Sequence, residues 1–286
     1  MNIVTIKDKR YPKLLKKIGK DAPKQLYYKG EWDSAIFKNC LAVVGSRQMT
    51  SYGKRVAEQI VTEVAAAGIT IVSGFMYGID SEAHKAALRS GGRTIAIMPC
   101  GIELIHPEYQ QDLYHEILNN KGLVISEYEG EMQPVNWTYP RRNRIVAGLS
   151  KAVLVVEAGI KSGSLITANF AKKFSRKVFA VPGPITSETS KGTLQLIKEG
   201  AHLVTSAKDI LDFYKIKSLM ESGQKSSVHG LEGLEKEIIE RLRREPLEID
   251  ALARTFGISA SKLGITLSMM QLRGLINQEG NKYYVG

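Results

Sequence analysis

The stretch CLAVVGSRQMTSYGKRVAEQIVTEVAAAGITIVSG, residues 40–74, decides the fold. It contains an apolar run, a polar loop, an amphipathic helical pattern over 52–68 that ends in Gly68, and a second apolar run. Two apolar strands joined through a helix are typical of parallel pairing, because parallel strands need a long crossover connection. The stretch therefore predicts a parallel sheet covered by helices.

The same alternation of strand and helix continues along the chain. Short, apolar, β-branched runs follow at 93–98, 123–127, 152–158 and 177–181. Helical patterns lie between these runs at 81–92, 107–122, 143–150 and 163–175. Repeated alternation of this kind predicts an α/β domain with a mostly parallel sheet and helices on both faces, over residues 39–215.

The segments on either side of this domain differ from it in composition. Residues 1–38 hold 10 Lys and Arg against 4 Asp and Glu, and are predicted to form a short basic lead-in that packs on the domain. Residues 216–230 have the Ser, Gly and Lys bias of a linker. Residues 231–286 show three short helical patterns and a terminal β-hairpin, which predicts a small winged-helix domain.

Composition and charge narrow the class of protein. With 43% hydrophobic and 24% charged residues, the chain is typical of soluble globular proteins. We expect no signal peptide and no membrane span, because the start lacks an apolar core and every long apolar run contains charges. Cys40 and Cys100 stand far apart in no metal-binding spacing. The expectation is a cytoplasmic protein with reduced thiols and no metal or cofactor.

The net charge of +11 favours a polyanionic partner. Residues 230–286 carry 8 basic and 8 acidic residues, which balance. The whole excess of positive charge therefore lies in residues 1–229, and we expect any anion-binding surface there.

Two loops that follow predicted strands have the composition of phosphate sites. Gly45, Ser46 and Arg47 come directly after the first strand and before a helix. The second loop precedes another helix and contains Lys161, Ser162, Gly163 and Ser164. Free N–H groups at a helix N-terminus, together with hydroxyl and cationic side chains, bind anions. The structural alternative is a tight turn with a Ser or Thr cap and Arg47 in a surface ion pair.

A cluster of arginines lies between these loops. Arg141, Arg142, Asn143 and Arg144 are consecutive, and two aromatic residues precede them. Guanidinium groups beside aromatic rings are suited to contact a nucleic-acid backbone and to stack on its bases. The alternative is a solvated run of charges.

Other polar residues at strand ends favour structural roles. Asp80 or Ser81 is predicted to cap a helix, and His84 to be a packed or hydrogen-bonded side chain. Glu157 is either a catalytic base or a buried acceptor for a helix cap, with the cap favoured. The sequence contains no histidine spacing typical of metal ligands, no nucleophile elbow and no close pair of carboxylates, so we expect no catalytic residue.

The ordered set of motifs resembles the DNA-processing protein A family, also called DprA or Smf. The motifs are VVGSR, YGID, GGRTIAIM, LVISEY, PRRNRIVAGLS, VVEA, SGSLITA and VFAVPG, and they span roughly residues 11–214. The resemblance implies an extended Rossmann-like domain that binds and protects single-stranded DNA, forms a homodimer and loads the RecA recombinase onto that DNA. In the family this serves natural transformation, the uptake of DNA by competent cells, and it implies no catalytic activity.

Carried over by position, the resemblance places DNA contacts on the two glycine loops and on the cluster from Arg141 to Arg144. It places the dimer and recombinase surface around Leu194 to Val204. The family usually has Ala-Arg before its GID motif, whereas this chain has Met76 and Tyr77. Tyr77 is therefore expected to replace a basic contact by stacking on a base.

Two other functions compete with this one. The chain also resembles the "lonely guy" nucleotide phosphoribohydrolases, in which Glu157 would act as acid or base. The winged-helix segment would suit a regulator that reads duplex DNA. The zero net charge of residues 230–286 argues against a strong DNA contact there and favours a module that contacts protein.

Overall fold

The structure, a computed structural model, describes residues 2–217 and 233–285. The chain divides into two compact units, with the boundary between residues 219 and 220. Of the predicted linker, residues 218–230 lie outside the described residues.

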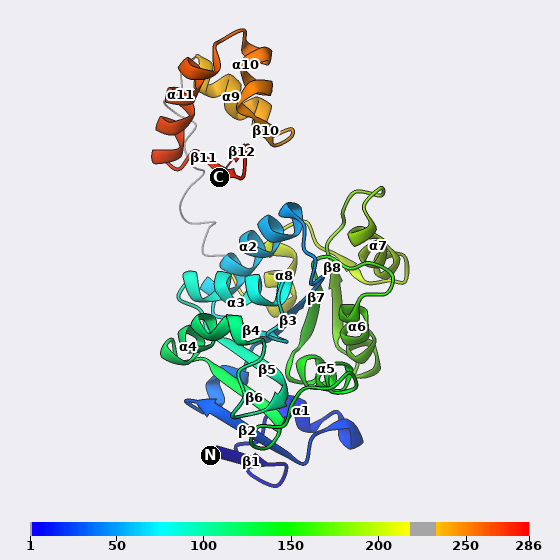
Figure 1. Cartoon of the computed structure of the whole chain (residues 1–286). Helices are drawn as coiled ribbons and strands as arrows, with labels where there is room; N and C mark the ends of the chain where they lie inside the picture. Colours follow the sequence, from blue (N-terminus) through cyan, green and yellow to red (C-terminus); the bar gives the residue numbers. More distant parts are fainter. Residues whose placement is uncertain (1, 218–232, 286) are drawn as a thin grey trace. The chain divides into compact units, whose positions relative to one another are not determined.

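The first unit contains a single nine-stranded sheet (Figure 1). Its strands are β1 (Asn2–Thr5), β2 (Gln25–Gly30), β3 (Cys40–Val44), β4 (Thr70–Ser73), β5 (Thr94–Gly101), β6 (Leu123–Tyr128), β7 (Ala152–Val155), β8 (Lys177–Ala180) and β9 (His202–Leu203). Their spatial order is β1-β2-β6-β5-β4-β3-β7-β8-β9. In this order, all neighbouring strands from β6 to β9 pair in parallel. Strand β1 pairs with β2, and β2 with β6, in the antiparallel direction. The predicted mostly parallel α/β fold is confirmed.

Helices cover both faces of this sheet. They are α1 (Lys13–Lys16), α2 (Ser51–Ala66), α3 (Ile79–Arg89), α4 (Gln111–Asn119), α5 (Thr138–Leu149), α6 (Gly163–Lys173), α7 (Lys191–Lys198) and α8 (Ala207–Tyr214). Side chains of α1, α5 and α6 share one buried cluster, and side chains of α2, α3 and α8 share the cluster on the opposite face. The sheet is therefore apolar on both sides, which is why its strands appear in the sequence as continuous apolar runs.

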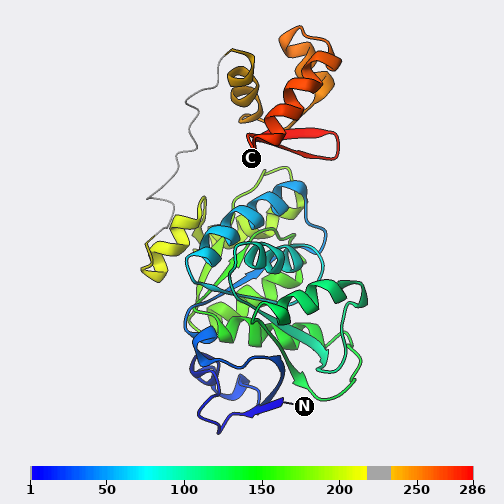
Figure 2. The ribbon, with the colours of Figure 1, turned by 90° about the vertical axis from the view of Figure 1, so that its left-hand side faces the viewer.

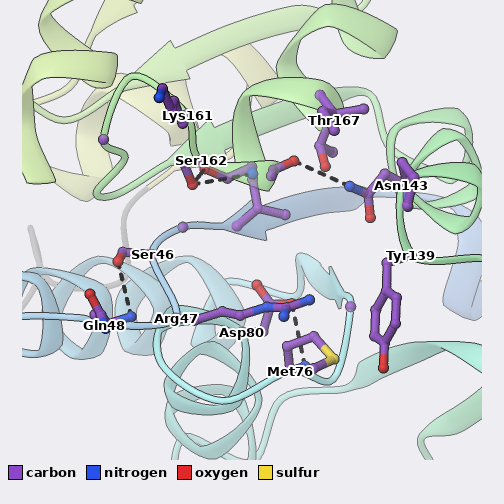
Figure 3. A pocket seen from close by; sticks show the side chains of 18 of the residues that line it. Ser46, Arg47, Gln48, Met76, Asp80, Tyr139, Asn143, Lys161, Ser162 and Thr167 are labelled. Carbon is purple, nitrogen blue, oxygen red and sulfur yellow. Dashed lines mark hydrogen bonds between the residues drawn. The ribbon is translucent and has the colours of Figure 1, made fainter. Parts of the chain in front are cut away.

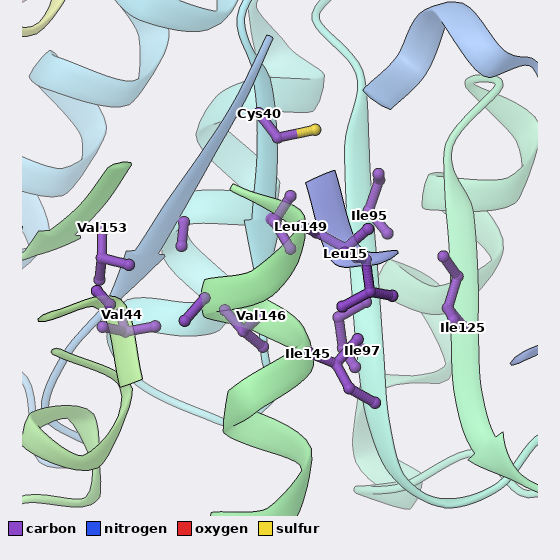
Figure 4. Packing of buried hydrophobic residues seen from close by; sticks show 14 of the residues in the cluster. Leu15, Cys40, Val44, Ile95, Ile97, Ile125, Ile145, Val146, Leu149 and Val153 are labelled. Atoms are coloured by element: carbon purple, nitrogen blue, oxygen red, sulfur yellow. The ribbon is translucent and has the colours of Figure 1, made fainter. Parts of the chain in front are cut away.

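Helix α5 lies at the centre of the first of these clusters (Figure 4). Its Ile145, Val146 and Leu149 are buried against the strands. Cys40 and Cys100 are both free and buried. Burial raises the pKa of the Cys40 thiol to about 12 and that of Cys100 to about 11, so neither is a thiolate at neutral pH.

The lead-in contributes two strands to the sheet of the domain, whereas the sequence predicted only that it packs on the domain. Strands β1 and β2 extend the sheet beyond β6, with Tyr28 opposite Ile125. Between β1 and β2 lies the single helical turn α1, whose Leu15 is fully buried. Figures 1 and 2 both place this N-terminal segment, in dark blue, at the end of the unit away from α2.

The second unit contains three helices and a small sheet. Its elements are α9 (Leu234–Leu242), β10 (Leu247–Glu248), α10 (Ile249–Phe256), α11 (Ala260–Leu272), β11 (Ile276–Glu279) and β12 (Lys282–Val285). Strands β11 and β12 form the predicted terminal hairpin, and β10 pairs with β12. One apolar core joins all three helices, with Ile238, Leu252 and Leu263 at its centre.

The part of the chain that the structure describes contains neither a membrane-spanning helix nor a cluster of metal-ligating side chains. None of the helices in residues 2–217 and 233–285 is both long enough and apolar enough to cross a membrane. In these same two ranges, no three His, Cys, Asp or Glu side chains gather as metal ligands would.

Acidic conditions are expected to destabilise the fold through His84. This side chain is fully buried in α3, with Nδ1 2.6 Å from Thr94 Oγ1. Burial lowers its pKa from the usual 6.5 to about 3. The unfolded chain therefore binds a proton below pH 6.5 that the folded chain does not, so the stabilisation is complete above pH 6.5 and is lost as the pH falls toward 3.

The expected loss from this group is about 1.4 kcal/mol of unfolding free energy per pH unit. Urea denaturation at a series of pH values would measure it in the wild type and in His84→Gln, which has no titratable group there. The variant should lose stability less steeply, by the equivalent of about one proton. Equal slopes for the two proteins would show that His84 does not govern the acid response.

Candidate nucleic-acid interface

A pocket of about 680 Å³ opens at the carboxyl ends of the parallel strands. Its walls come from the loops after β3, β4 and β7 and from the first half of α5. Strand β3 is the switch point of the sheet, because β4 pairs with one side of it and β7 with the other. Open α/β sheets bind ligands at this position.

Most of the residues predicted to bind DNA line this pocket. They are Gly45, Ser46, Arg47, Tyr77, Arg142, Asn143, Lys161, Ser162, Gly163 and Ser164. Arg141 and Arg144 do not line it. The pocket therefore unites the two glycine loops, but only part of the arginine cluster.

The loop after β3 brings its backbone close to the start of α3. Ser46 accepts two hydrogen bonds, at Oγ from the Gln48 N–H (3.0 Å) and at its carbonyl from the Ile79 N–H (3.2 Å). A Cβ on Gly45 would lie 2.5 Å from Ile79 Cγ1, so only glycine fits without a shift. This close approach holds Ser46 at the pocket wall.

The guanidinium group of Arg47 lies close to two aromatic rings. Figure 3 shows Arg47 extending toward one of them, Tyr139. The guanidinium carbon of Arg47 is 5.6 Å from the ring centre of Tyr77 and 5.2 Å from that of Tyr139. Both distances are those of cation–π contacts. Within the described residues Arg47 forms no ion pair, so the alternative of a surface ion pair is wrong.

The aromatic rings around Arg47 are partly open to solvent. Tyr77 is 42% exposed, and Tyr109 nearby is 70% exposed. Tyr139 is hydrogen-bonded through its hydroxyl to His106 Nε2, at 2.9 Å. Burial lowers the pKa of His106, and the charges of Arg47 and Arg142 lower it further, which favours the neutral ring. The pocket thus presents ring faces beside a cation, an arrangement suited to stacking bases.

Arg142 has a different role from the one predicted. Only 3% of the residue is exposed, and its Nη1 donates to the carbonyl oxygens of Gly74 and Ile97. Burial lowers the pKa of Arg142 to about 10, with nearby Asp80 opposing the shift, so it remains cationic at neutral pH. Its hydrogen bonds join the loop after β4 to the middle of β5, and it is a supporting residue rather than a free phosphate ligand.

The three arginines predicted to contact DNA do not lie together on one surface. Helix α5 begins at Thr138, five residues earlier than the pattern indicated, so these arginines project from different sides of one helix. Arg144 is 2.6 Å from Glu127 and buried, and Arg141 is 3.4 Å from the same carboxylate. Arg141 also lies 5.8 Å from the ring of Trp137. One acidic residue thus holds both guanidinium groups outside the pocket.

The loop after β7 forms the opposite wall. Ser162 is the N-cap of α6, and its Oγ accepts from the Ser164 N–H at 3.3 Å. The two serine hydroxyls are 2.7 Å apart. Asn143 Nδ2 donates to the Gly163 carbonyl at 3.3 Å, which ties this loop to α5, and Lys161 is exposed at the rim. Hydroxyls, a helix N-terminus and a cation make this wall suited to an anion.

The N-terminus of α3 is capped differently from what the sequence predicts. The N-cap of α3 is Gly78 at φ +80°, and neither Asp80 nor Ser81 caps the helix. Asp80 accepts from the Met76 N–H at 3.4 Å. Burial raises its pKa, while the charge of Arg142 opposes that shift. Asp80 is therefore a buried acceptor for the Met76 N–H in the pocket wall, with the positive charge of Arg142 nearby, in line with a structural role.

Glu157 is a cap acceptor, the favoured of its two predicted roles. It is 2% exposed and accepts from the Thr50 N–H (2.9 Å) and from Thr50 Oγ1 (2.6 Å), where Thr50 is the N-cap of α2. Thr189 Oγ1 also donates to it, at 3.2 Å. The carboxylate is not part of the pocket lining, so this geometry gives no support to an acid or base role.

Several lining residues were not predicted. They include Gln48, Met76, Asp80, Pro140, Ile166, Thr167, Glu188 and Thr189. Glu188 and Thr189 come from the loop after β8, and the rule that ligands sit beyond strand ends would have included that loop. Of the two aromatic residues predicted beside the arginines, Tyr139 lines the pocket and Trp137 does not. Pro140 was missed because α5 was predicted to begin too late.

The chain matches known proteins along nearly its whole length. Residues 2–215 match the family model of DNA recombination-mediator protein A, and residues 223–282 match that of the DprA winged helix domain. Protein Smf of Synechocystis sp. is 32% identical over 316 residues, which cover 98% of this chain and 79% of the relative.

Two solved structures are similar to the first unit. The crystal structure of DNA processing protein A from Streptococcus pneumoniae has a TM-score of 0.70 and 41% identity, covering 76% of this chain and 74% of the other. DNA processing protein A from Helicobacter pylori has a TM-score of 0.66 and 31% identity, covering 75% and 96%. The structure of the Helicobacter pylori protein was described for its mode of single-stranded DNA binding.

Proposed function

This chain belongs to the DNA recombination-mediator protein A family, and from that membership we propose that it binds single-stranded DNA in the pocket at the carboxyl ends of β3, β4 and β7. The observation that carries the proposal is Arg47, whose guanidinium group lies close to the rings of Tyr77 and Tyr139, directly beside the glycine loops. A relative from Helicobacter pylori that binds single-stranded DNA supports it.

Each wall of the pocket would contact a different part of a nucleotide. Phosphate oxygens would accept hydrogen bonds from Ser46, from Arg47 and from the N-terminus of α6 at Ser164. Bases would stack on Tyr77 and Tyr139, a contact that contributes about 1–3 kcal/mol per base. Neither kind of contact depends strongly on base identity, so binding would tolerate any sequence.

The proposal is a binding role without a bond-breaking step. Glu157, the residue a phosphoribohydrolase would need, has its oxygens engaged by Thr50 and Thr189. A protein that only holds and protects single strands needs no general base.

Recombinase loading and dimer formation are further parts of the proposal. The segment from Leu194 to Val204, which the family resemblance assigns to these contacts, contains the end of α7 and the edge strand β9. Leu203 is 44% exposed there, and one side of β9 has no neighbouring strand in the described sheet. A homodimer would bind one DNA strand with two pockets, and this avidity would raise the affinity. The DNA would then be transferred to RecA.

The winged-helix unit favours a protein contact over duplex recognition. Ile265, Met269 and Leu272 are spaced along the outer face of α11 and are between 52% and 83% exposed. Apolar side chains on this helix do not suit a phosphate backbone. A role as a duplex-reading regulator is therefore the weaker candidate.

Arg47→Ala is expected to weaken binding of an oligothymidine of about 30 nucleotides at least about 10-fold, because a charge-assisted phosphate contact contributes about 1.5–3 kcal/mol. The slope of log affinity against log salt should become shallower by about 0.7, the value for one phosphate contact on a single strand. Fluorescence anisotropy at several salt concentrations measures both quantities.

Arg141→Ala serves as the matched control for this experiment. It removes the same charge from just outside the pocket, where Glu127 already pairs with it, and affinity should change less than about 2-fold. Binding of a duplex of equal length should be weaker than binding of the single strand. If the wild type prefers the duplex and Arg47→Ala has no effect, the proposed pocket is wrong.

A further inference from the structure

The pocket accounts for little of the positive charge of this chain. Its lining contains the cations Arg47, Arg142 and Lys161 and the carboxylates Asp80 and Glu188, whereas the net charge is +11. The lead-in, residues 1–38, has 10 basic against 4 acidic residues. Most of the excess in the first unit therefore lies away from the pocket.

Part of this excess is concentrated on and just after α1. Lys13, Lys16 and Lys17 are spaced three and four residues apart, so they lie on neighbouring positions of one helical turn, and Lys20 follows directly. All four are exposed, while Leu15 between them is fully buried. These four residues are called the α1 lysine cluster below.

The α1 lysine cluster has no carboxylate to neutralise it. None of its four side chains forms an ion pair or hydrogen bond within residues 2–217 and 233–285. The nearby acidic side chains already have partners, since Asp8 pairs with Arg10 at 2.8 Å and Asp21 with Lys173 at 2.7 Å. An exposed, unpaired group of like charges is costly unless water or a polyanion screens it.

We propose that the α1 lysine cluster is a second contact surface for the nucleic-acid backbone, which extends the path of a single strand whose bases occupy the pocket. This inference rests on the proposed function of the pocket. It adds a phosphate-binding surface that the pocket residues do not include.

Two helices connect the pocket to the cluster. The first half of α5 lines the pocket, and near its end a Cβ on Gly148 would contact Leu15 and Ile18 of the lead-in. From Asn143 to Gly148 the helix rises roughly 8 Å. Figure 1 shows α1 beside the end of α5.

Helix α6, like α5, runs from the pocket to the lead-in. Its N-terminus at Gly163 lines the pocket, and Lys173 in its last turn pairs with Asp21 of the lead-in. Arg176, just after this helix, donates to the Leu14 carbonyl at 2.9 Å. Both helices thus begin at the pocket and end against the segment that carries the lysines, so a strand along them would reach the cluster.

Nucleic acid suits this surface better than a lipid bilayer does. A helix that binds a membrane surface inserts exposed apolar side chains between the headgroups. Here Leu15 and Ile18 are buried in the core of the protein, and no large hydrophobic side chain within 11–24 is strongly exposed. The surface offers charge alone, which matches a phosphate backbone.

The test is the triple substitution of Lys16, Lys17 and Lys20 by Gln in the full chain. For an oligothymidine of about 30 nucleotides we expect the salt slope to become shallower by about 2, at about 0.7 per lost contact. Affinity at low salt should fall at least about 10-fold. For an oligothymidine of about 3 nucleotides, too short to reach beyond the pocket, affinity should change less than about 2-fold.

A matched control removes the same charge elsewhere. Lys85, Lys121 and Lys236 are exposed lysines on other elements, and their triple substitution by Gln should leave both oligonucleotides bound as in the wild type. If the control variant binds the long oligonucleotide as weakly as the cluster variant does, the loss of affinity results from the lower net charge and the proposal is overturned.

Other outcomes also overturn the proposal. An unchanged salt slope in the cluster variant would do so, and equal losses for the short and long oligonucleotides would indicate a damaged fold instead of a lost surface. Lysine-dependent sedimentation with vesicles of phosphatidylglycerol and phosphatidylcholine, without any change in DNA binding, would assign the surface to lipid. If the wild type binds neither oligonucleotide, the proposed function itself fails, which is a distinct result.

Discussion

Arg142→Met should lower the free energy of unfolding by about 2–6 kcal/mol, because two buried carbonyl oxygens would each lose their hydrogen-bond donor, at about 1–3 kcal/mol each. Arg142 is 3% exposed and donates to the carbonyl oxygens of Gly74 and Ile97. Methionine has a similar length but no donor, so both carbonyl oxygens would be left without a hydrogen bond, and the positive charge that favours ionised Asp80 would be lost. Urea denaturation monitored by far-UV circular dichroism measures the loss.

Arg141→Met is the natural control for this change. It lies one residue away on the same helix but is exposed, and its unfolding free energy should change by about 0.5 kcal/mol or less. The experiment also separates two roles for Arg142. If Arg142 were a free phosphate ligand, as the sequence indicated, the methionine variant would keep its stability and lose DNA affinity. Normal stability would therefore contradict the supporting role.

Gly78→Ala is expected to cost about 3 kcal/mol of stability and to weaken DNA binding at least about 10-fold. Gly78 has a φ of +80°, and an added Cβ would contact the Ser46 carbonyl oxygen and lie 2.8 Å from Arg47 Cα. Both of these atoms belong to the backbone of the loop after β3. This backbone cannot move aside without displacing the pocket wall. Denaturation and anisotropy on the same preparation measure the two effects.

Gly91→Ala separates conformational strain from the clash. Gly91 has a similar φ of +69°, but an added Cβ would meet nothing within 4 Å. The control should cost only about 1–2 kcal/mol, the penalty for an L-residue in this region, and DNA affinity should be unchanged. If both alanine variants bind DNA normally, the close approach of these two loops does not shape the pocket.

The parallel sheet could be predicted because each inner strand is apolar on both faces, as at 41–44 and 152–155. Strands β1 and β2 were not predicted as part of it. Strand β2 pairs antiparallel with β6, which lies roughly 100 residues later, and β1 joins the sheet only through β2. No local pattern specifies such a distant partner. The start of α5 was missed because Pro140 precedes the apolar pattern, although proline is well tolerated in a first helical turn.

The glycine loops of the pocket could be predicted for a local reason: a turn between a strand and a helix N-terminus has the same chemistry wherever it occurs. The arginines could not be resolved in this way. Arg142, Arg144 and Arg141 are near neighbours, yet their roles depend on Gly74, Ile97 and Glu127, which come from three other strands or loops. Burial and partner choice are set by the fold, so composition alone assigned all three to one surface.

During synthesis, the first residues of this chain wait for a partner that is translated much later. Tyr28 in β2 can pair with Ile125 in β6 only after the ribosome has made roughly 100 further residues. Until then β2, and β1 that pairs with it, have no sheet edge to join. The N-terminal region can therefore complete its place in the sheet only after β6 has been made, although it leaves the ribosome long before β6.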